Sequence, residues 1–294
     1  MPEFPIANRT KRVLLGLIGS PIAHSAAPAM HEAAARAAGI DLHYHLIEVS
    51  GASRDDLSAM LDGVRRLGFS GVNITFPYKE AVIPLLDALS PDAAAIGAVN
   101  TVVARKGKLT GHNTDATGFA TAYRALGRDD GDAPVAIIGA GGVGKAIGFA
   151  LASCGVTRLR LFDPDRAKCE GLATQLAGRA QVEVAATVEA AVADVAGIVN
   201  GSPVGMLPNR DTPVPATLLR ARQWVADAVY HPLWTPLLIG ARNVGAMVMT
   251  GRELSIHQAV DAFALFTDAT APYEAIATAF DRSLAAREAK RHAA

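Results

Sequence analysis

The chain has 294 residues, a formal net charge of zero and 50% hydrophobic residues. This balance argues against nucleic acid or an anionic membrane surface as a partner, because no excess of Lys and Arg exists to attract either. No uninterrupted apolar run approaches the roughly 20 residues that a membrane-spanning helix needs. The length indicates about two domains, each large enough to bury a core.

The two cysteines, Cys154 and Cys169, lack the spacing of a metal site. We expect them to be packing thiols in the reducing cytoplasm rather than a disulfide, and we expect no bound metal.

Apolar runs typical of strands alternate with segments of helical period along the chain. This alternation predicts an α/β protein with parallel sheets covered by helices. In the first part of the chain, strands are predicted at residues 13–19, 44–49 and 71–75, and helices at 28–38, 54–67 and 78–89. Residues 99–112 have the pattern of a β-hairpin that turns at Arg105-Lys106-Gly107-Lys108.

Polar residues follow the predicted strands of this first part. Ser20 to Ser25 come after the first strand, Asn73 to Lys79 span the end of the third, and Asn113 to Asp115 follow the hairpin. Open α/β sheets bind their ligands at such strand ends.

Lys79 is the best candidate for the base that takes the hydroxyl proton when a secondary alcohol is oxidised. Pro77 is expected to begin a helix, whose dipole disfavours a cation in the first turn and suits a proton carrier. Asp115 is expected to orient the lysine and to hydrogen-bond the same hydroxyl. Neutral donors and acceptors for a polyhydroxylated ring come from Asn73, Thr75, Asn100 and Asn113.

A structural explanation of the same residues stays open. Lys79 fits a solvated helix lysine, and Asp115 fits an N-cap of a helix over residues 116–126. The asparagines fit turns equally well.

The second part of the chain begins with a glycine motif. The apolar run Val135-Ala136-Ile137-Ile138 leads into Gly139-Ala140-Gly141-Gly142-Val143-Gly144, and a helical pattern follows. In a dinucleotide site, Gly139 permits a tight turn, Gly141 lets the backbone approach a pyrophosphate, and Gly144 lets helix and strand pack closely. A glycine-rich turn without a ligand is the alternative.

Asp163 strengthens the prediction of a dinucleotide site. It ends the next apolar run, 19 residues after Gly144, where a carboxylate is expected to hold the 2′-hydroxyl of an adenosine ribose. Because about 135 residues precede the motif, the fold predicted is an N-terminal α/β substrate domain plus a Rossmann dinucleotide-binding domain.

The remaining predicted elements complete the second part. Strands are expected at residues 158–163, 182–185, 197–200, 224–229 and 246–249, and helices at 145–154 and 166–177. After Gly251 the chain is expected to be mostly helical, with a fraying charged end over residues 287–294.

Taken together, the motifs resemble the shikimate dehydrogenase family, including its quinate-oxidising branch. The resemblance covers nearly the whole chain and rests on seven motifs in order. These are His24-Ser25-Ala26-Ala27-Pro28, residues 73–79, 97–101, 113–115 and 139–144, Asn200-Gly201-Ser202-Pro203-Val204-Gly205-Met206, and Tyr230-His231-Pro232-Leu233-Trp234-Thr235-Pro236-Leu237-Leu238.

The resemblance implies reversible oxidation of a cyclic hydroxy-carboxylate with Lys79 and Asp115 as the catalytic pair. It implies a substrate domain over residues 1–115 that helices in 251–294 complete, and a Rossmann domain over 116–250. The substrate contacts implied are Ser25, Asn73, Thr75, Asn100, Tyr230 and Gln258, and the cofactor contacts are residues 139–144, Asp163, Ser202, Pro203 and Gly251.

The chain departs from the family pattern at the cofactor. Members that use the phosphorylated cofactor carry Asn-Arg-Thr where this chain has Asp163-Pro164-Asp165. A carboxylate about 4 Å from a phosphate charge costs up to ~4 kcal/mol at an intermediate dielectric. Arg166 is not expected to offset two acids, so NAD is expected and NADP is disfavoured.

Other departures concern the substrate. Ala27 replaces a family serine, or in some quinate oxidisers a threonine, that helps to hold the substrate carboxylate or the neighbouring ring carbon. The loss of one hydrogen bond to this charged group costs ~1.5–3 kcal/mol. His231 replaces an asparagine and Leu254 a methionine. An NAD-linked dehydrogenase of an aminoshikimate-type ring or a cyclic polyol is therefore an alternative, and a dinucleotide-binding regulatory protein without turnover is another. A monomer or a homodimer is expected.

Overall fold

The computed structural model describes residues 12–128 and 130–293. Residues 1–11, which belong to the predicted first domain, and Ala294 lie outside the described residues. The described residues divide into two compact units: those up to 89, 100–112 and those from 259 on form unit 1, and those in 90–99 and 113–258 form unit 2. Within the described residues no helix is both long and apolar enough to cross a membrane.

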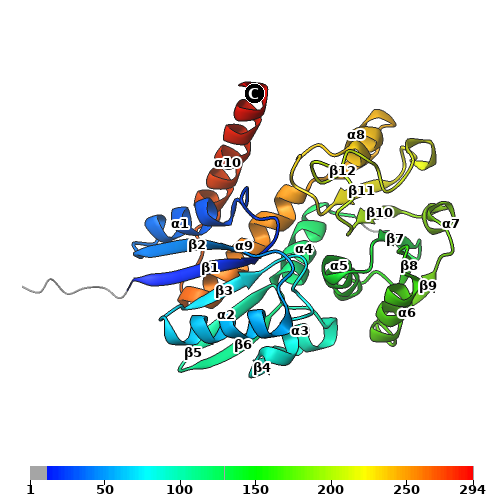
Figure 1. Cartoon of the computed structure of the whole chain (residues 1–294). Coiled ribbons are helices and arrows are strands. Elements are labelled where there is room, and N and C mark those ends of the chain that lie inside the picture. The colour runs from blue at the N-terminus through cyan, green and yellow to red at the C-terminus, as the bar shows by residue number, and fades with distance from the viewer. Residues whose placement is uncertain (1–11, 129, 294) are drawn as a thin grey trace, which may run out of the picture. The chain divides into compact units, whose positions relative to one another are not determined.

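Unit 1 contains a six-stranded sheet in the order β2-β1-β3-β5-β6-β4 (Figure 1). The pairs β2-β1 and β1-β3 are parallel, whereas β5 runs antiparallel to β3 and to β6. The strands are β1 (Val13–Gly19), β2 (Leu42–Glu48), β3 (Gly71–Ile74), β4 (Ala88–Leu89), β5 (Thr101–Arg105) and β6 (Lys108–His112).

Helices of unit 1 bury apolar stripes. In α2 (Arg54–Arg66) the buried residues Leu57, Leu61 and Val64 recur at helical spacing, and Ser53 with Asp56 forms a capping box at its start. Helix α1 (Ala27–Ala37) packs against α10 (Tyr273–Ala293). Helix α9 (Gly251–Thr267) begins in unit 2, and its residues from 259 onward belong to unit 1.

Unit 2 contains a six-stranded parallel sheet in the order β12-β11-β10-β7-β8-β9. The order reverses at β7, which carries the glycine motif at its carboxyl end, and this is the switch point where such sheets bind nucleotides. The strands are β7 (Val135–Ile138), β8 (Arg158–Phe162), β9 (Gln181–Val184), β10 (Gly197–Asn200), β11 (Trp224–Asp227) and β12 (Met247–Met249).

The two faces of this second sheet pack on different helices. Alternate residues such as Ile137 and Val199 face a core shared with α4 (Thr114–Ala125), α5 (Gly142–Ser153) and α6 (Arg166–Gln175). Their neighbours Ile138 and Ile198 face a core shared with α7 (Val188–Val192) and α8 (Pro236–Asn243). Helix α3 (Pro91–Ile96) contacts α5. Because helices cover both faces of this sheet, its strands β7, β10 and β11 consist mostly of apolar residues.

The predicted hairpin is confirmed. Arg105 pairs with Lys108, and the two turn residues Lys106 and Gly107 both have positive φ. This geometry matches a type I′ turn, which follows the twist of the two strands.

One predicted helix is wrong. Residues 78–89 do not form a helix but turns, a short 3₁₀ helix (η1, Ile83–Leu85) and the strand β4. Over residues 287–293, where a fraying end was expected, the structure continues the helix α10 to Ala293. The short elements β4, α3, α7 and α8 were not predicted from the sequence.

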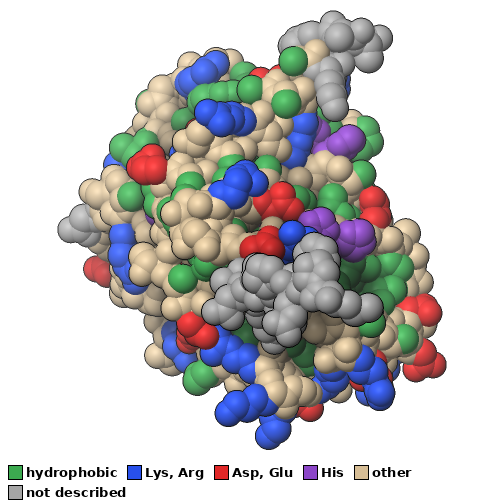
Figure 2. All heavy atoms as spheres, turned by 90° about the vertical axis from the view of Figure 1, so that its left-hand side faces the viewer, with side chains coloured by type: hydrophobic (Ala, Val, Ile, Leu, Met, Phe, Trp, Pro, Cys, Tyr) green, Lys and Arg blue, Asp and Glu red, His purple; other side chains and the backbone are tan. Residues whose placement is uncertain are grey.

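Charges of both signs share the surface. Figure 2 shows that Lys and Arg side chains lie among Asp and Glu side chains on the face it presents. In unit 1 such neighbours form ion pairs, as between Arg12 and Asp41 at 2.9 Å. The mixed pattern accords with the zero net charge of the sequence.

Candidate active site

The polar loops of unit 1 meet at one edge of its sheet. The loops after the parallel strands β1 and β3 leave at the same edge, and Thr101 pairs with Asn73, so the start of β5 lies there too. The Ser20 N–H donates to the Phe76 carbonyl at 3.0 Å, which ties the first two loops together. The structure therefore brings Ser25, Thr75, Lys79 and Asn100 to one edge of this unit.

Lys79 lies in a turn that Tyr78 holds in place. The Tyr78 hydroxyl donates to the Val49 carbonyl at 3.0 Å and accepts from the Ala52 N–H at 2.9 Å. Lys79 itself is half-buried. No α-helix begins at Pro77, so the effect of a helix dipole expected on Lys79 does not apply. Lys79 instead follows directly after a tyrosine whose hydroxyl is bonded to the segment after β2.

Asn73 has both amide hydrogens engaged inside unit 1. Its Nδ2 donates to the Asn100 carbonyl at 3.1 Å and to Thr101 Oγ1 at 3.0 Å, while its Oδ1 accepts from the Tyr44 hydroxyl at 2.9 Å. Asn73 thus supports the neighbouring Asn100 and has no amide hydrogen left to donate to a ligand.

Tyr44 in turn stacks on a buried histidine. The His31 ring lies 4.9 Å from the Tyr44 ring, near Phe263 and Phe266, and the residue is 1% exposed. Burial lowers the pKa of His31 to about 3, so the ring is neutral.

Asp115 lies in the first turn of α4 in unit 2, but it does not cap the helix. Asn113 is the N-cap: its side chain accepts from the Ala116 N–H at 3.1 Å and donates to the Ala98 carbonyl at 2.9 Å. The cap role considered for Asp115 is therefore wrong. Asp115 is 7% exposed, and its charge sits at the end of the helix that favours anions.

Gly118, one turn after Asp115, allows α4 to approach α9 closely. A Cβ at Gly118 would lie 2.6 Å from the backbone nitrogen of Gln258. Any side chain at this position would push the two helices apart. The contact brings Asp115 and Gln258 onto neighbouring turns of packed helices, and the Gln258 amide donates to the Ser255 carbonyl at 3.0 Å.

The glycine loop has the expected local geometry. Gly139 has φ of +99°, which a side chain rarely adopts, and a Cβ at Gly144 would collide with the Gly139 carbonyl. Gly141 is the N-cap of α5, without a side chain that caps the helix, and a Cβ there would meet nothing within 4 Å. The space beside Gly141, at the N-terminus of α5, is therefore open, which leaves room for a phosphate near the helix N-terminus.

Asp163 follows β8 and contacts the same loop. One carboxylate oxygen accepts from the Ala140 N–H at 2.8 Å and the other from the Asp165 N–H at 2.9 Å. Asp163 is half-buried, and each oxygen retains a free lone pair, so it can also accept from ribose hydroxyls. Arg166 is occupied by an ion pair with Glu170 at 2.8 Å.

The remaining predicted site residues of unit 2 follow the strands β10, β11 and β12. Ser202 donates to Asn200 Oδ1 at 2.6 Å, and Pro203 beside it is exposed. Tyr230 is half-buried in the segment after β11, and Gly251 is buried where α9 begins.

A buried carboxylate, Asp227, links these segments. Burial raises its pKa to about 7, while the hydrogen bonds from Thr235, the Val229 N–H and Asn200 act in the opposite direction. Sequence reasoning missed Asp227, Tyr78 and Gly118. Their only signal was proximity to recognised motifs: Tyr78 precedes Lys79, and Gly118 follows Asp115 by one helical turn.

These arrangements define a class of protein. A parallel sheet that reverses order at a glycine loop, with an acid after the next strand, is a dinucleotide-binding unit, and it accompanies a separate α/β unit that gathers polar groups at one edge. Within the described residues no three or more His, Cys, Asp or Glu side chains are placed to hold a metal ion.

Comparison with known proteins identifies the family. The family model described as "Shikimate dehydrogenase substrate binding domain" matches residues 17–102, and the ThiF family model matches residues 129–229. A quinate/shikimate dehydrogenase (NAD(+)) of Corynebacterium efficiens is 44% identical over 87% of this chain and 93% of its own length. A shikimate dehydrogenase (NADP(+)) of Streptomyces avermitilis is 42% identical over 86% of this chain and 90% of its own.

A solved structure agrees with these matches. The quinate dehydrogenase of Corynebacterium glutamicum in complex with NAD has a TM-score of 0.84 and 40% identity, over 92% of this chain and 99% of that one. The chain belongs to the shikimate dehydrogenase family.

Proposed function

We propose that this protein is an NAD-dependent dehydrogenase that reversibly oxidises a ring secondary alcohol of quinate, shikimate or a close relative. The observation that carries the proposal is the likeness to the NAD-linked quinate/shikimate dehydrogenase of Corynebacterium efficiens over 87% of this chain. In this proposal unit 1 supplies Lys79, Ser25, Thr75 and Asn100 to the substrate, and unit 2 binds the cofactor and supplies the remaining substrate contacts.

Lys79 and Asp115 are the catalytic pair of this proposal. Lys79 accepts the proton of the substrate hydroxyl as the carbon is oxidised and returns it in the reverse reaction. Asp115 accepts a hydrogen bond from the same hydroxyl and stabilises the lysine after it has gained the proton. The bound cofactor supplies the acceptor for the hydride that leaves the carbon.

The other contacts follow the family motifs. Ser25, Thr75, Asn100, Tyr230 and Gln258 hold the ring and its carboxylate, and Asn73 acts on the substrate through Asn100, to which its amide donates. The glycine loop, Ser202, Pro203 and Gly251 hold the cofactor.

Asp163 supports NAD rather than NADP. A carboxylate after β8 can accept from a ribose 2′-hydroxyl but repels a 2′-phosphate, and Arg166 is already paired with Glu170. The relatives include both NAD(+)-named and NADP(+)-named dehydrogenases, and in this proposal Asp163 determines which of the two cofactors the protein uses.

Ala27 favours a second candidate within the same class. Its position at the start of α1 lacks the hydroxyl of the family pattern, and its N–H is bonded to Ser25 Oγ at 3.2 Å. A related cyclic polyol or an aminoshikimate-type ring fits a site that has lost this donor. A regulatory protein without turnover is disfavoured, because it would have no need for both Lys79 and Asp115.

We propose that the enzyme works in the cytoplasm as a monomer or a homodimer. Its two free thiols, Cys154 and Cys169, suit a reducing compartment.

A substrate panel tests the function. Shikimate, quinate, an aminoshikimate-type ring and a cyclic polyol are each offered with NAD and with NADP, and the absorbance of the reduced nicotinamide is followed. We expect turnover of a cyclohexane or cyclohexene carboxylate with NAD. Dinucleotide binding without turnover of any ring would overturn the enzyme and favour the regulatory protein.

A further inference from the structure

Asp227 is the last residue of β11 and is 2% exposed. Its carboxylate accepts three hydrogen bonds. Asn200 Nδ2 and the Val229 N–H both donate to Oδ1 at 2.9 Å, and the Thr235 hydroxyl donates to Oδ2 at 2.7 Å. Burial removes a carboxylate from water at a large cost in free energy, and hydrogen bonds from several donors are needed to offset that cost.

The first of these bonds reaches the loop after β10. Asn200 Nδ2 also donates to the Val204 carbonyl at 3.0 Å, and Asn200 Oδ1 accepts from the Ser202 N–H at 3.0 Å and from the Ser202 hydroxyl. The Ser202 hydroxyl accepts from the Val204 N–H at 3.3 Å. Asp227 therefore holds the Asn200 side chain, which in turn makes the hydrogen bonds that hold this loop.

The other two bonds close the segment after β11. Val229 and Thr235 stand at its two ends, and both donate to the same carboxylate. Tyr230 lies between them. Thr235 is also the N-cap of α8, where its hydroxyl accepts from the Leu238 N–H at 3.3 Å.

We infer that Asp227 is a positioning residue that fixes the Ser202 loop (residues 201–206) and the Tyr230 segment (residues 229–235) together through one carboxylate. The inference rests on the proposed function, in which Ser202 contacts the cofactor and Tyr230 the substrate. Loss of this anchor therefore loosens the contacts with both ligands, whereas loss of either loop alone would affect one.

The decisive variants are Asp227→Asn, Thr235→Val and Thr235→Ser. The first turns one acceptor into a donor that faces the Thr235 hydroxyl, the second deletes that hydroxyl at nearly constant shape, and the third restores it. We expect the KM values for NAD and for the ring substrate each to rise about fivefold or more in the first two variants. Thr235→Ser should stay near the wild type.

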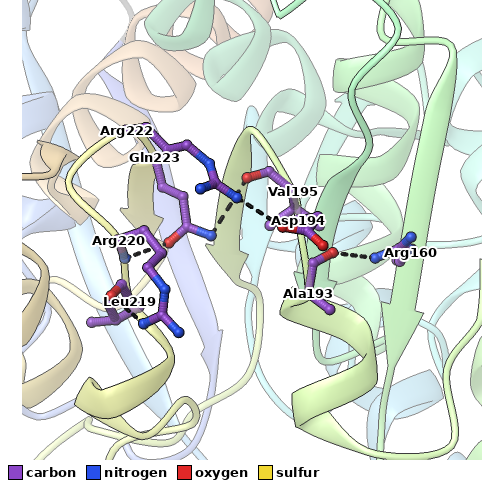
Figure 3. Close-up of polar contacts among 8 residues, drawn as sticks. All are labelled: Arg160, Ala193, Asp194, Val195, Leu219, Arg220, Arg222 and Gln223. Carbon is purple, nitrogen blue, oxygen red and sulfur yellow. Dashed lines mark hydrogen bonds and ion pairs between the residues drawn. The ribbon is translucent and has the colours of Figure 1, made fainter.

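Gln223→Leu is the matched control. Gln223 is buried at the opposite end of β11, where it accepts from the Arg220 N–H at 2.9 Å and donates to the Val195 carbonyl at 3.4 Å (Figure 3). This variant loses buried hydrogen bonds at the other end of the same strand, opposite the end where Asp227 and the two loops lie. It should lower the melting temperature while both KM values stay unchanged.

Amide hydrogen exchange gives a readout that does not need turnover. Exchange in residues 201–206 and 229–235 should accelerate about tenfold or more in Asp227→Asn, with β7 unchanged. Unchanged KM values and exchange in folded Asp227→Asn would overturn the inference, as would equal KM increases in Gln223→Leu. If Asp227→Asn does not fold, the comparison of Thr235→Val with Thr235→Ser decides. Equal KM values in these two variants would also overturn the inference. Failure of the proposed function shows separately, as a wild type without turnover.

Discussion

His31 makes the stability of unit 1 sensitive to acid. Both ring nitrogens lack a hydrogen-bond partner within the described residues, and the groups around the ring are the aromatic side chains of Tyr44, Phe263 and Phe266. The folded-state pKa of about 3 lies below the ordinary value of 6.5, so only the unfolded chain takes up this proton as the pH falls below about 6.5.

The free energy of unfolding should therefore fall by about 2 kcal/mol between pH 7 and pH 5 through this group alone. In His31→Phe that part of the pH dependence should vanish, because every other titratable group is kept. Urea unfolding of both proteins at the two pH values measures the difference. An equal loss of stability in both proteins would contradict the role given to His31.

Asp115→Asn separates chemistry from helix capping. Because Asn113 caps α4, the amide should leave the melting temperature nearly unchanged. It cannot stabilise a protonated lysine as a carboxylate does, so kcat should fall by about 10²-fold or more. Steady-state rates alongside thermal unfolding decide the matter. A near-native kcat would remove Asp115 from the catalytic pair.

At the scale of elements, the contact of α4 with α9 governs the placement of Gln258. In Gly118→Ala the new methyl group must displace the backbone at Gln258, which we expect to cost about 1–3 kcal/mol of stability. On the proposed role of Gln258, the KM for the ring substrate should also rise about tenfold.

Gly171→Ala is the control for helix propensity. Gly171 lies within α6, where a Cβ would meet nothing within 4 Å, so alanine should stabilise the protein by about 0.5–1 kcal/mol. Denaturant unfolding and steady-state kinetics on both variants test the pair. A Gly118→Ala protein as stable and as active as Gly171→Ala would show that the close approach is unimportant.

Elements set by local chemistry were predictable from the sequence, and those set by distant partners were not. The turn at Lys106 and Gly107 carries its own geometry, so the hairpin followed from the sequence. Residues 78–89 have apolar residues at helical spacing, but the Tyr78 hydroxyl bonds to the loop after β2, and Asp87 accepts from the Leu109 N–H. These tertiary hydrogen bonds outweigh helix propensity.

The same contrast holds for the site. The glycine loop and Asp163 form a motif of known spacing, so they were recognised although Asp163 contacts Ala140 from 23 residues away. Asp227 belongs to no such motif, and only the sheet brings it to Asn200, 27 residues away. The proposed catalytic roles themselves came from the family motifs, since spacing alone left Lys79 and Asp115 with structural explanations.

At the scale of the whole molecule, Asp163 indicates that the protein prefers NAD to NADP. The kcat/KM with NAD should exceed that with NADP at least about tenfold, because the carboxylate repels the 2′-phosphate. Replacement of Asp163, Pro164 and Asp165 by Asn, Arg and Thr should narrow or invert the preference. Asparagine keeps an acceptor for the Ala140 N–H, so the loop should survive. Comparable native activity with both cofactors would contradict this account.

The most direct test of the central claim is the rate at which Lys79→Ala oxidises the best ring substrate with NAD. If Lys79 carries the hydroxyl proton, kcat should fall by ~10²–10⁴-fold while NAD affinity and melting temperature stay near native values. Lys108→Ala, which removes an exposed lysine from β6 of the same unit, should keep the native rate. A near-native kcat in Lys79→Ala would contradict the proposed mechanism.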